Sequence, residues 1–133
     1  MKISSRGRYA LRVMVDLAEH GDSGYIPMKE VAQRQEISLK YLEKILPLLV
    51  AGKLVEGIHG KGGGYRLTRS PGEYTIGEIL RLTEGDLAPV SCLECNTGEC
   101  RRSATCRTLP MWNELNRRTL EYLDSVTIAD LMK

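Results

Sequence analysis

The residues of this chain that are most capable of chemistry are its cysteines. The 133-residue sequence contains four, and all of them lie within one segment of fifteen residues: Cys92, Cys95, Cys100 and Cys106. Gly, Asn and charged residues occupy positions between them, which indicates a loop and not a core element. In a reducing compartment, clustered thiols more often bind a metal or respond to oxidation than form a structural disulfide framework.

Several chemistries suit this cluster of thiols. Thiolates hold the iron of iron–sulfur clusters, and a flexible loop can bring them within the width of one cluster. Zinc is less favoured, because paired Cys-x-x-Cys knuckles would be expected and only Cys92 and Cys95 have that spacing. A metal-free thiol–disulfide switch and inert cysteines are the other interpretations. The neighbouring Arg101, Arg102 and Arg107 would favour formation of thiolates.

The distribution of charge divides the chain into two unlike halves. Residues 1–69 carry 12 Lys and Arg against 7 Asp and Glu, whereas residues 70–133 carry 7 against 10. A basic half joined to an acidic half suits a nucleic-acid-binding module linked to a module with another role. No apolar run approaches the ~20 residues that cross a bilayer, and the N-terminus lacks the apolar region of a signal peptide. We therefore expect a cytoplasmic protein without a membrane partner.

The elements that precede the cysteines begin with three short helices. Residues 5–19 carry apolar side chains at helical spacing, and Asp16 is off that stripe. Pro27 suits the first turn of a second helix, and Ser38 is a good N-cap for a third. Pro47 lies inside the third apolar pattern and removes one backbone hydrogen bond, so we expect that helix to kink or stop just before it.

A glycine-rich β-hairpin follows the third helix. Residues 53–58 and 65–68 are predicted to be its strands, and residues 59–64, with the sequence HGKGGG, its turn. Two short helices joined by a tight connection and followed by such a hairpin indicate a winged helix-turn-helix. A Walker-type phosphate loop is excluded, because the spacing is wrong and no Lys-Ser/Thr follows.

This arrangement predicts which side chains face DNA. The second helix of a helix-turn-helix enters the major groove, so its exposed hydroxyls and lysines should contact base edges and phosphates. The candidates on that helix are Ser38, Lys40, Tyr41 and Lys44. In the hairpin turn, glycines allow close approach of the backbone and lysine neutralises phosphate. The candidates there are His59, Lys61, Gly62 and Gly63.

Two further helices are expected after the hairpin. Thr75 suits the N-cap of the first of them, which should end at Gly85. A long helix should start near Thr108, with Pro110 in its first turn and an apolar stripe over residues 109–123, and a last short turn should span residues 128–132. We therefore divide the chain into a winged-helix domain (1–85), a cysteine-bearing sensor loop (86–107) and a dimerisation helix with a C-terminal turn (108–133).

The stretches KISSRGRYAL, ISLKYLE and KLVEGIHGKGGGYRL resemble the IscR, NsrR and CymR family of winged-helix transcription regulators, the Rrf type, and the resemblance covers essentially the whole chain. It implies a mainly α fold with a two-stranded β wing, no enzymatic activity, and a homodimer that binds palindromic double-stranded promoter DNA through its wings and recognition helices. The long C-terminal helix would be the dimerisation element. In such relatives the glutamate that matches Glu43 helps to choose between operator classes.

The resemblance also assigns a role to the cysteine loop. In sensor members of the family, three loop cysteines ligate a 2Fe-2S or 4Fe-4S cluster, and the matching residues here are Cys92, Cys100 and Cys106. Some members add a histidine three residues after the last cysteine, where this chain has Leu109, and others use an acidic residue where this chain has Arg8. Cys95 is the expected fourth ligand, with Glu94, Glu99 or an exogenous ligand as alternatives.

The chain departs from the family in its wing, and two other classes of function stay open. Relatives commonly have Arg at the place of His59 and often Pro at the place of Lys61. A small iron–sulfur electron-transfer protein would need the cysteines but not the glycine-rich hairpin. A protein-binding adaptor could have kept the fold and lost its affinity for DNA.

Overall fold

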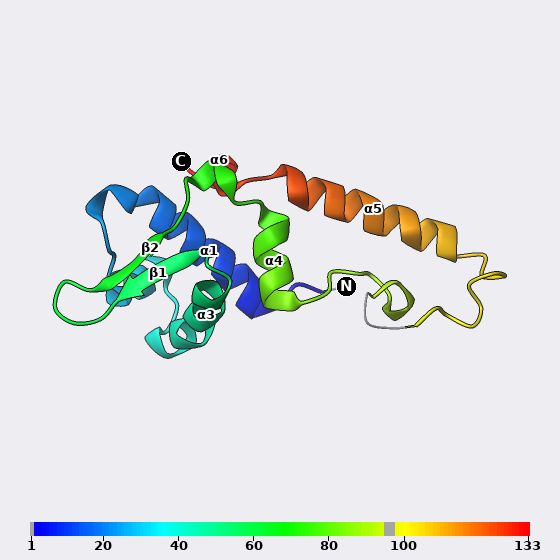
Figure 1. Cartoon of the computed structure of the whole chain (residues 1–133), viewed down its shortest axis with the longest axis horizontal. Helices are drawn as coiled ribbons and strands as arrows, with labels where there is room; N and C mark the ends of the chain where they lie inside the picture. The colour runs from blue at the N-terminus through cyan, green and yellow to red at the C-terminus, as the bar shows by residue number, and fades with distance from the viewer. Residues whose placement is uncertain (1, 95–97) are drawn as a thin grey trace.

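The computed structural model describes residues 2–94 and 98–133. The fold is mainly helical with one two-stranded sheet, as predicted. In chain order, the helices are α1 (Ser5–Glu19), α2 (Met28–Gln35), α3 (Leu39–Ala51), α4 (Ile76–Glu84), α5 (Leu109–Ser125) and α6 (Ile128–Leu131), and the strands are β1 (Val55–Ile58) and β2 (Gly64–Leu67). The strands form an antiparallel hairpin between α3 and α4, which is the order of a winged helix-turn-helix (Figure 1).

Hydroxyl side chains cap the starts of four described helices, α1, α3, α4 and α6. The Oγ of Ser4 accepts a hydrogen bond from the backbone N–H of Gly7 at the start of α1. Ser38 and Thr75 cap α3 and α4 in the same way, which confirms both predicted N-caps. Each cap satisfies a backbone N–H that the first helical turn leaves without a partner.

The core lies around α1. Apolar residues of this helix are completely or almost completely buried, and they are Ala10, Val13, Met14 and Leu17. They belong to the same core cluster as the inward face of α3 and as Tyr74, whose hydroxyl donates to the carbonyl oxygen of Leu54 at 2.8 Å. Helix α1 therefore provides part of the core against which the helix-turn-helix packs.

The expectation that the helix could stop just before Pro47 is wrong, because α3 runs from Leu39 to Ala51. The proline ring is exposed, whereas Ile45, Leu46 and Leu49 on either side of it are buried. A proline inside a helix costs about 3 kcal/mol, and burying a leucine or isoleucine side chain returns roughly 1.5–3 kcal/mol. Packing of three such side chains therefore outweighs the cost of the lost hydrogen bond.

The hairpin is attached to the segment before α2. Tyr65 and Ile26 exchange two backbone hydrogen bonds of 2.9 Å, so the chain at Ile26 forms an isolated bridge on the open edge of β2. Gly64 lies against the carbonyl group of Ile26, and a β-carbon there would collide with it. Strand β1 begins two residues later than expected, and Lys53 takes a left-handed conformation with φ 60° just before it.

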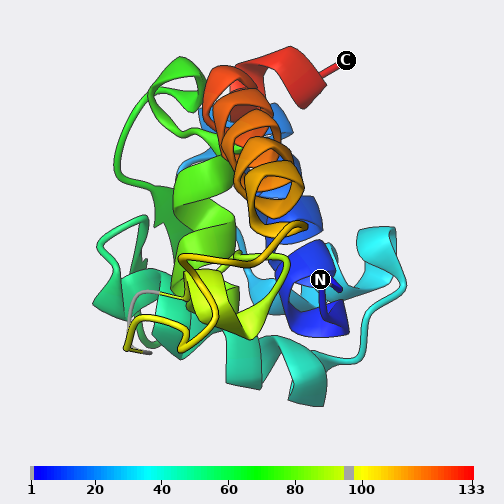
Figure 2. The ribbon, with the colours of Figure 1, turned by 90° about the vertical axis from the view of Figure 1, so that its right-hand side faces the viewer.

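Helix α5 extends away from this body along the long axis of the molecule (Figure 1). Its C-terminal half is attached to α4, where Arg81 donates hydrogen bonds of 2.7 and 2.9 Å to the two carboxylate oxygens of Asp124. Leu120 and Leu123 pack against the core, and Gly77 of α4 leaves the space that the Asp124 carboxylate occupies. Figure 2 looks along α5, with the cysteine loop in front of the remainder of the chain. None of the described helices has both the length and the apolar character needed to cross a membrane.

Candidate DNA interface and cysteine loop

The recognition helix α3 has one buried face and one charged face. Lys40, Glu43 and Lys44 are exposed and share a side of the helix, because residues three and four apart are neighbours on its surface. Ser38 is also exposed, and its oxygen accepts the hydrogen bond of 3.1 Å from the backbone N–H of Tyr41. The hydroxyl proton of Ser38 stays available for donation to another acceptor.

Tyr41 lies at the edge of this face and is half-buried against α1. Its ring meets that of Tyr9 edge-on, with ring centroids 5.3 Å apart and an angle of 73° between planes. The guanidinium of Arg12 lies 5.2 Å from the centre of the Tyr9 ring, and its Nε donates to the side-chain oxygen of Gln35. Sequence reasoning missed Tyr9 and Arg12, because they belong to the first helix and only folding brings Tyr9 against Tyr41 of α3 and Arg12 against Gln35 of α2.

The wing contributes exposed residues on the same side of the molecule as the start of α3. His59 and Lys61 are exposed, as is Gly62, which has a φ of 80° and open space where a side chain would be. Gly63 is half-buried, and a β-carbon there would meet the carbonyl oxygen of Ile58. His59 and Leu39 line one groove, so the fold brings the wing and the recognition helix together.

A buried carboxylate positions α2 against α1. Asp16 was expected on the polar side of α1, but its side chain is only 1% exposed. It accepts hydrogen bonds from Arg34 Nε and Nη2 at 3.0 and 2.7 Å and from Gln35 Nε2 at 2.9 Å. Burial alone would raise the pKa of Asp16, but these hydrogen bonds and the charge of Arg34 outweigh it and hold the pKa below its usual value. The sequence pattern did not predict this burial, because Arg34, the charged partner of Asp16, lies eighteen residues further along the chain.

The cysteine loop follows α4. Cys92 lies in a short 3-10 turn (Ser91–Leu93), and Cys100 and Cys106 lie further along the loop. All three are free thiols and half-buried, and Cys95 falls outside the described residues. Among the described residues, no three His, Cys, Asp or Glu side chains are close enough together to hold a metal ion. The donors nevertheless fit an iron–sulfur cluster chemically, because they are soft thiols gathered in one loop.

One of these thiols has a distinct environment. Cys106 Sγ lies 3.4 Å from the Oγ1 of Thr108, at the point where the loop enters α5. A hydrogen bond from the Thr108 hydroxyl, supported by backbone N–H groups of Thr108 and Leu109, lowers the pKa of Cys106. A lower pKa gives more thiolate at neutral pH, and the thiolate is the form that binds metals and attacks disulfides.

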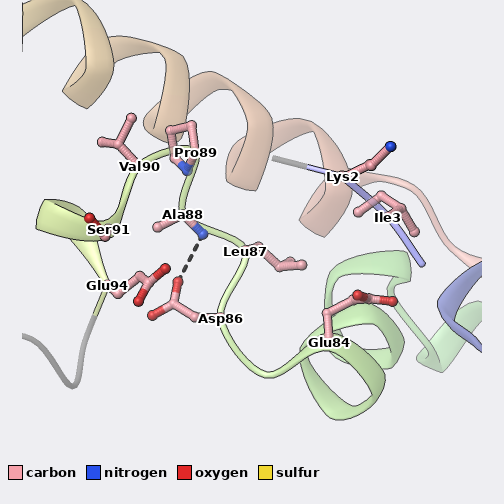
Figure 3. Close-up of a pocket in the computed structure, with 10 residues that line it drawn as sticks. All are labelled: Lys2, Ile3, Glu84, Asp86, Leu87, Ala88, Pro89, Val90, Ser91 and Glu94. Atoms are coloured by element: carbon pink, nitrogen blue, oxygen red, sulfur yellow. Dashed lines mark hydrogen bonds between the residues drawn. The ribbon is translucent and has the colours of Figure 1, made fainter.

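The N-terminal residues Lys2 and Ile3 and the base of the loop line one cavity (Figure 3). A cavity of about 240 Å³ separates Lys2 and Ile3 from the segment that leads toward Cys92. Glu84 at the end of α4 accepts hydrogen bonds from the hydroxyl and the backbone N–H of Ser4, at 2.5 and 3.3 Å. The end of α4, from which the loop starts, is therefore in contact with the start of α1. Helix α1 in turn packs in the same core as α3.

A helix-turn-helix followed by a two-stranded wing, with lysines on the exposed face of the second helix of the pair, defines a winged-helix DNA-binding protein. The family comparison makes the class specific. The chain belongs to the Rrf2 family, whose model is described as an iron-dependent transcriptional regulator and matches residues 3–133. The protein is thus a DNA-binding transcriptional regulator and not an enzyme.

Individual relatives agree with this assignment. The chain is 34% identical to the HTH-type transcriptional regulator IscR of Vibrio campbellii, over all of this chain and 78% of that protein. It is 37% identical to protein rrf2 of Nitratidesulfovibrio vulgaris, over all of this chain and 88% of that protein. Among solved structures, CymR, the global cysteine regulator of B. subtilis, matches with a TM-score of 0.80 and 36% identity over 98% of this chain and 95% of that one. IscR of T. potens matches with a TM-score of 0.77 and 32% identity over 98% and 85%.

Proposed function

We propose that this regulator binds palindromic promoter DNA as a homodimer and senses redox state, nitric oxide or iron–sulfur status through a cluster held by its cysteine loop. The observation that carries the proposal is a lysine-bearing recognition helix and wing in the same chain as a loop of free thiols. The division into a DNA-binding part (1–85), a sensor loop (86–107) and a dimerisation part (108–133) belongs to this proposal.

The proposed DNA contacts are the exposed residues of α3 and the wing. Lys40 and Lys44 neutralise phosphates or reach guanine acceptors, and the hydroxyls of Ser38 and Tyr41 donate to phosphates or bases. Glu43 faces the groove with a negative charge, which is tolerated where a cytosine amino group donates to it. The proposed wing contacts are His59, Lys61, Gly62 and Gly63.

Exposure along α5 supports the proposed dimer. Met111, Leu115 and Tyr122 lie on one side of this helix and are 53%, 41% and 67% exposed. The chain has an accessible surface of 8600 Å², whereas a compact monomer of 14.9 kDa has about 7,000 Å². The additional accessible surface supports a dimer in which a second copy of the chain covers the long helix.

The proposed cluster ligands are Cys92, Cys100 and Cys106, with Cys95 as the fourth. When bound, a cluster supplies iron whose charge and ligation change with oxidants, nitric oxide and iron supply. The chain supplies thiolates, and the hydrogen bond from Thr108 supports the deprotonated form of Cys106. That same lowered pKa favours a metal-free thiol switch as the second candidate function.

The absorbance spectrum of anaerobically purified protein tests the cluster. A cluster gives visible absorbance that is lost in Cys100→Ser and Cys106→Ser, whereas Cys95→Ser changes its stability if this residue is the fourth ligand. A colourless protein that binds stoichiometric zinc would contradict the cluster, and a colourless protein that forms reversible disulfides would favour the thiol switch.

The salt dependence of DNA binding tests the interface. Each phosphate contact adds close to one to the slope of log affinity against log salt, so Lys44→Ala should lower that slope by about 1. Lys133→Ala is the control, because this lysine is at the end of the chain beside α1 and not on the recognition helix. Affinity for duplex DNA that does not respond to salt would contradict the proposed function.

A further inference from the structure

A pocket of about 290 Å³ lies between α4, α5 and the segment that leads from α4 into the cysteine loop. Residues 86–88 of that segment line it, and they also line the cavity beside the N-terminus (Figure 3). Its apolar part is formed by Leu87, Leu93 and Leu120. Sites for small molecules are typically apolar concavities of roughly 300–1,000 Å³ with a few polar groups that orient the ligand. The size of this pocket therefore suits a small ligand.

Asn116 of α5 brings a hydrogen-bond acceptor to this pocket. Its side-chain oxygen Oδ1 is buried and accepts no hydrogen bond from the part of the chain that the structure describes. Among the described residues that are at least partly buried, no other buried side-chain oxygen or nitrogen is in this state. Buried acceptors in native proteins almost always have a donor, and leaving one without a donor is costly. Oδ1 of Asn116 therefore favours a ligand that carries an N–H group.

Two oppositely charged side chains line the same pocket. Arg81 donates to both carboxylate oxygens of Asp124, but a guanidinium has more N–H groups than these bonds use and can donate to a further acceptor. Asp86 accepts a hydrogen bond from the backbone N–H of Ala88 at 2.8 Å, and its carboxylate adds a negative charge. A guanidinium binds a carboxylate group well, whereas amide and carboxylate oxygens both accept from an ammonium group.

We propose that this pocket binds a small zwitterionic amino acid with an apolar side chain. The carboxylate of the ligand pairs with Arg81, and its ammonium group donates to Asn116 Oδ1 and is attracted by Asp86. Its side chain contacts the three leucines that line the pocket. The inference goes beyond the proposed function, because it assigns a ligand site that needs neither DNA nor an iron–sulfur cluster.

The position of the pocket connects such a ligand with the cysteine loop. Leu93 directly follows Cys92 in the sequence, and Arg81 also holds α4 to α5 through Asp124. A ligand that contacts Leu93, Arg81 and Asn116 joins the base of the loop to the long helix. Because a ligand that binds the folded chain and not the unfolded chain raises stability, occupancy of the pocket should increase the unfolding temperature.

Isothermal titration calorimetry and thermal unfolding of the purified, reduced protein test the proposal. The probes are L-leucine, L-valine and L-methionine. At about a hundredfold excess over its Kd, a bound amino acid should raise Tm by roughly 5–10 °C. Isoamylamine and isocaproate are matched controls for L-leucine, because the first lacks the carboxylate and the second lacks the ammonium group. Each should bind at least about tenfold more weakly than L-leucine.

Asn116→Leu tests the acceptor. It replaces the side-chain amide by an apolar group of similar size, so the Kd for L-leucine should rise at least about tenfold. The ligand-free variant should unfold at a higher temperature than the wild type, because it no longer buries an acceptor without a donor. Asn113→Leu is the matched control, since Asn113 is exposed on the same helix and does not line the pocket, and it should bind L-leucine like the wild type.

Arg81→Gln tests the charge contact. It should weaken binding of L-leucine about tenfold and leave the affinity for isoamylamine unchanged, whereas a general disturbance of the pocket would weaken both. The inference would be overturned if none of the three amino acids gave a binding heat and a shift in Tm, or if Asn116→Leu bound L-leucine as tightly as the wild type. A ligand-free Asn116→Leu protein that is less stable than the wild type would also overturn it.

Discussion

At the scale of single residues, the most consequential feature is the buried carboxylate of Asp16. A buried charge is costly unless it is paired and hydrogen-bonded, and Asp16 receives three hydrogen bonds from Arg34 and Gln35. Both partners lie at the end of α2, immediately before the turn that leads into the recognition helix. Asp16 therefore fixes the end of α2 to α1. Because α3 follows α2 after a short turn, the same contact helps to orient α3.

Asp16→Ala should destabilise the fold by about 2–3 kcal/mol, because it removes a buried carboxylate together with its three hydrogen bonds from Arg34 and Gln35. Urea denaturation at neutral pH measures this change. Asp124→Ala is the matched control: its carboxylate has the same two-bond geometry with Arg81, but the pair is exposed, so the loss should be at most about 1 kcal/mol. Equal decreases in the free energy of unfolding of the two variants would show that burial does not increase the contribution of Asp16 to stability.

The pH dependence of this contribution follows from the lowered pKa of Asp16. A depressed native pKa gives stability that is fully present above the unfolded carboxyl value of about 3.9 and is lost as the pH falls through the lower native value. The difference in unfolding free energy between wild type and Asp16→Asn should therefore shrink as the pH falls below about 4. A difference that grows as the pH falls below about 4 would contradict the assigned direction of the pKa shift.

At the scale of elements, the continuous helix α3 shows packing overriding a local signal. Pro47 lacks the N–H that would bond to the carbonyl group four residues earlier, yet the helix continues because its apolar face is buried before and after the ring. The recognition helix is thus supported over thirteen residues. Its buried face anchors both halves in the core, with Leu42 in the N-terminal half and Leu49 in the C-terminal half, while the charged face stays exposed.

Replacing this proline should stabilise the helix. Pro47→Ala restores a backbone donor at an exposed position, and we expect a gain of about 1–3 kcal/mol in the free energy of unfolding. Thermal unfolding followed by circular dichroism measures it. Pro110→Ala is the control, since a proline in the first turn of α5 removes no helical hydrogen bond and its replacement should be nearly neutral.

Local signals explain which elements were predictable from the sequence. The caps at Ser38 and Thr75 and the glycine-rich turn need only neighbouring residues, and their predictions were right. The burial of Asp16 and the continuation of the helix beyond Pro47 depend on partners elsewhere in the fold, so periodicity gave the wrong answer for Asp16 and the missing N–H of proline gave it for the end of the helix. Likewise, the charged face of α3 was visible in the sequence, whereas the groove beside it required α2 and the wing to come together.

At the scale of the whole molecule, the wing and the cysteine loop lie at opposite ends of the long axis (Figure 1). Among the described residues, two contacts of α4, the helix before the loop, join it to its neighbours: Glu84 accepts from Ser4, and Arg81 donates to Asp124. Both join elements next to the loop to helices that support α3. A change in the loop therefore has a physical route toward the recognition helix through α1 and α4.

The exposed side of α5 leads to the last prediction, which concerns assembly. A glutamate placed among apolar side chains that a second copy would cover carries a desolvation cost, so Leu115→Glu and Tyr122→Glu should shift the proposed dimer toward monomer. Sedimentation of the purified variants measures this shift. Asn113→Glu adds the same charge at an exposed position away from Met111, Leu115 and Tyr122, and it should leave the dimer intact.

The same variants separate assembly from DNA contact. A monomer engages one half of a palindrome at a time and loses the gain in effective concentration that linked sites provide. Leu115→Glu should therefore bind a full palindrome no more tightly than an isolated half-site, although its recognition helix is unchanged. If Leu115→Glu and Tyr122→Glu sediment like the wild type and still prefer the palindrome, then α5 is not the surface on which two copies meet.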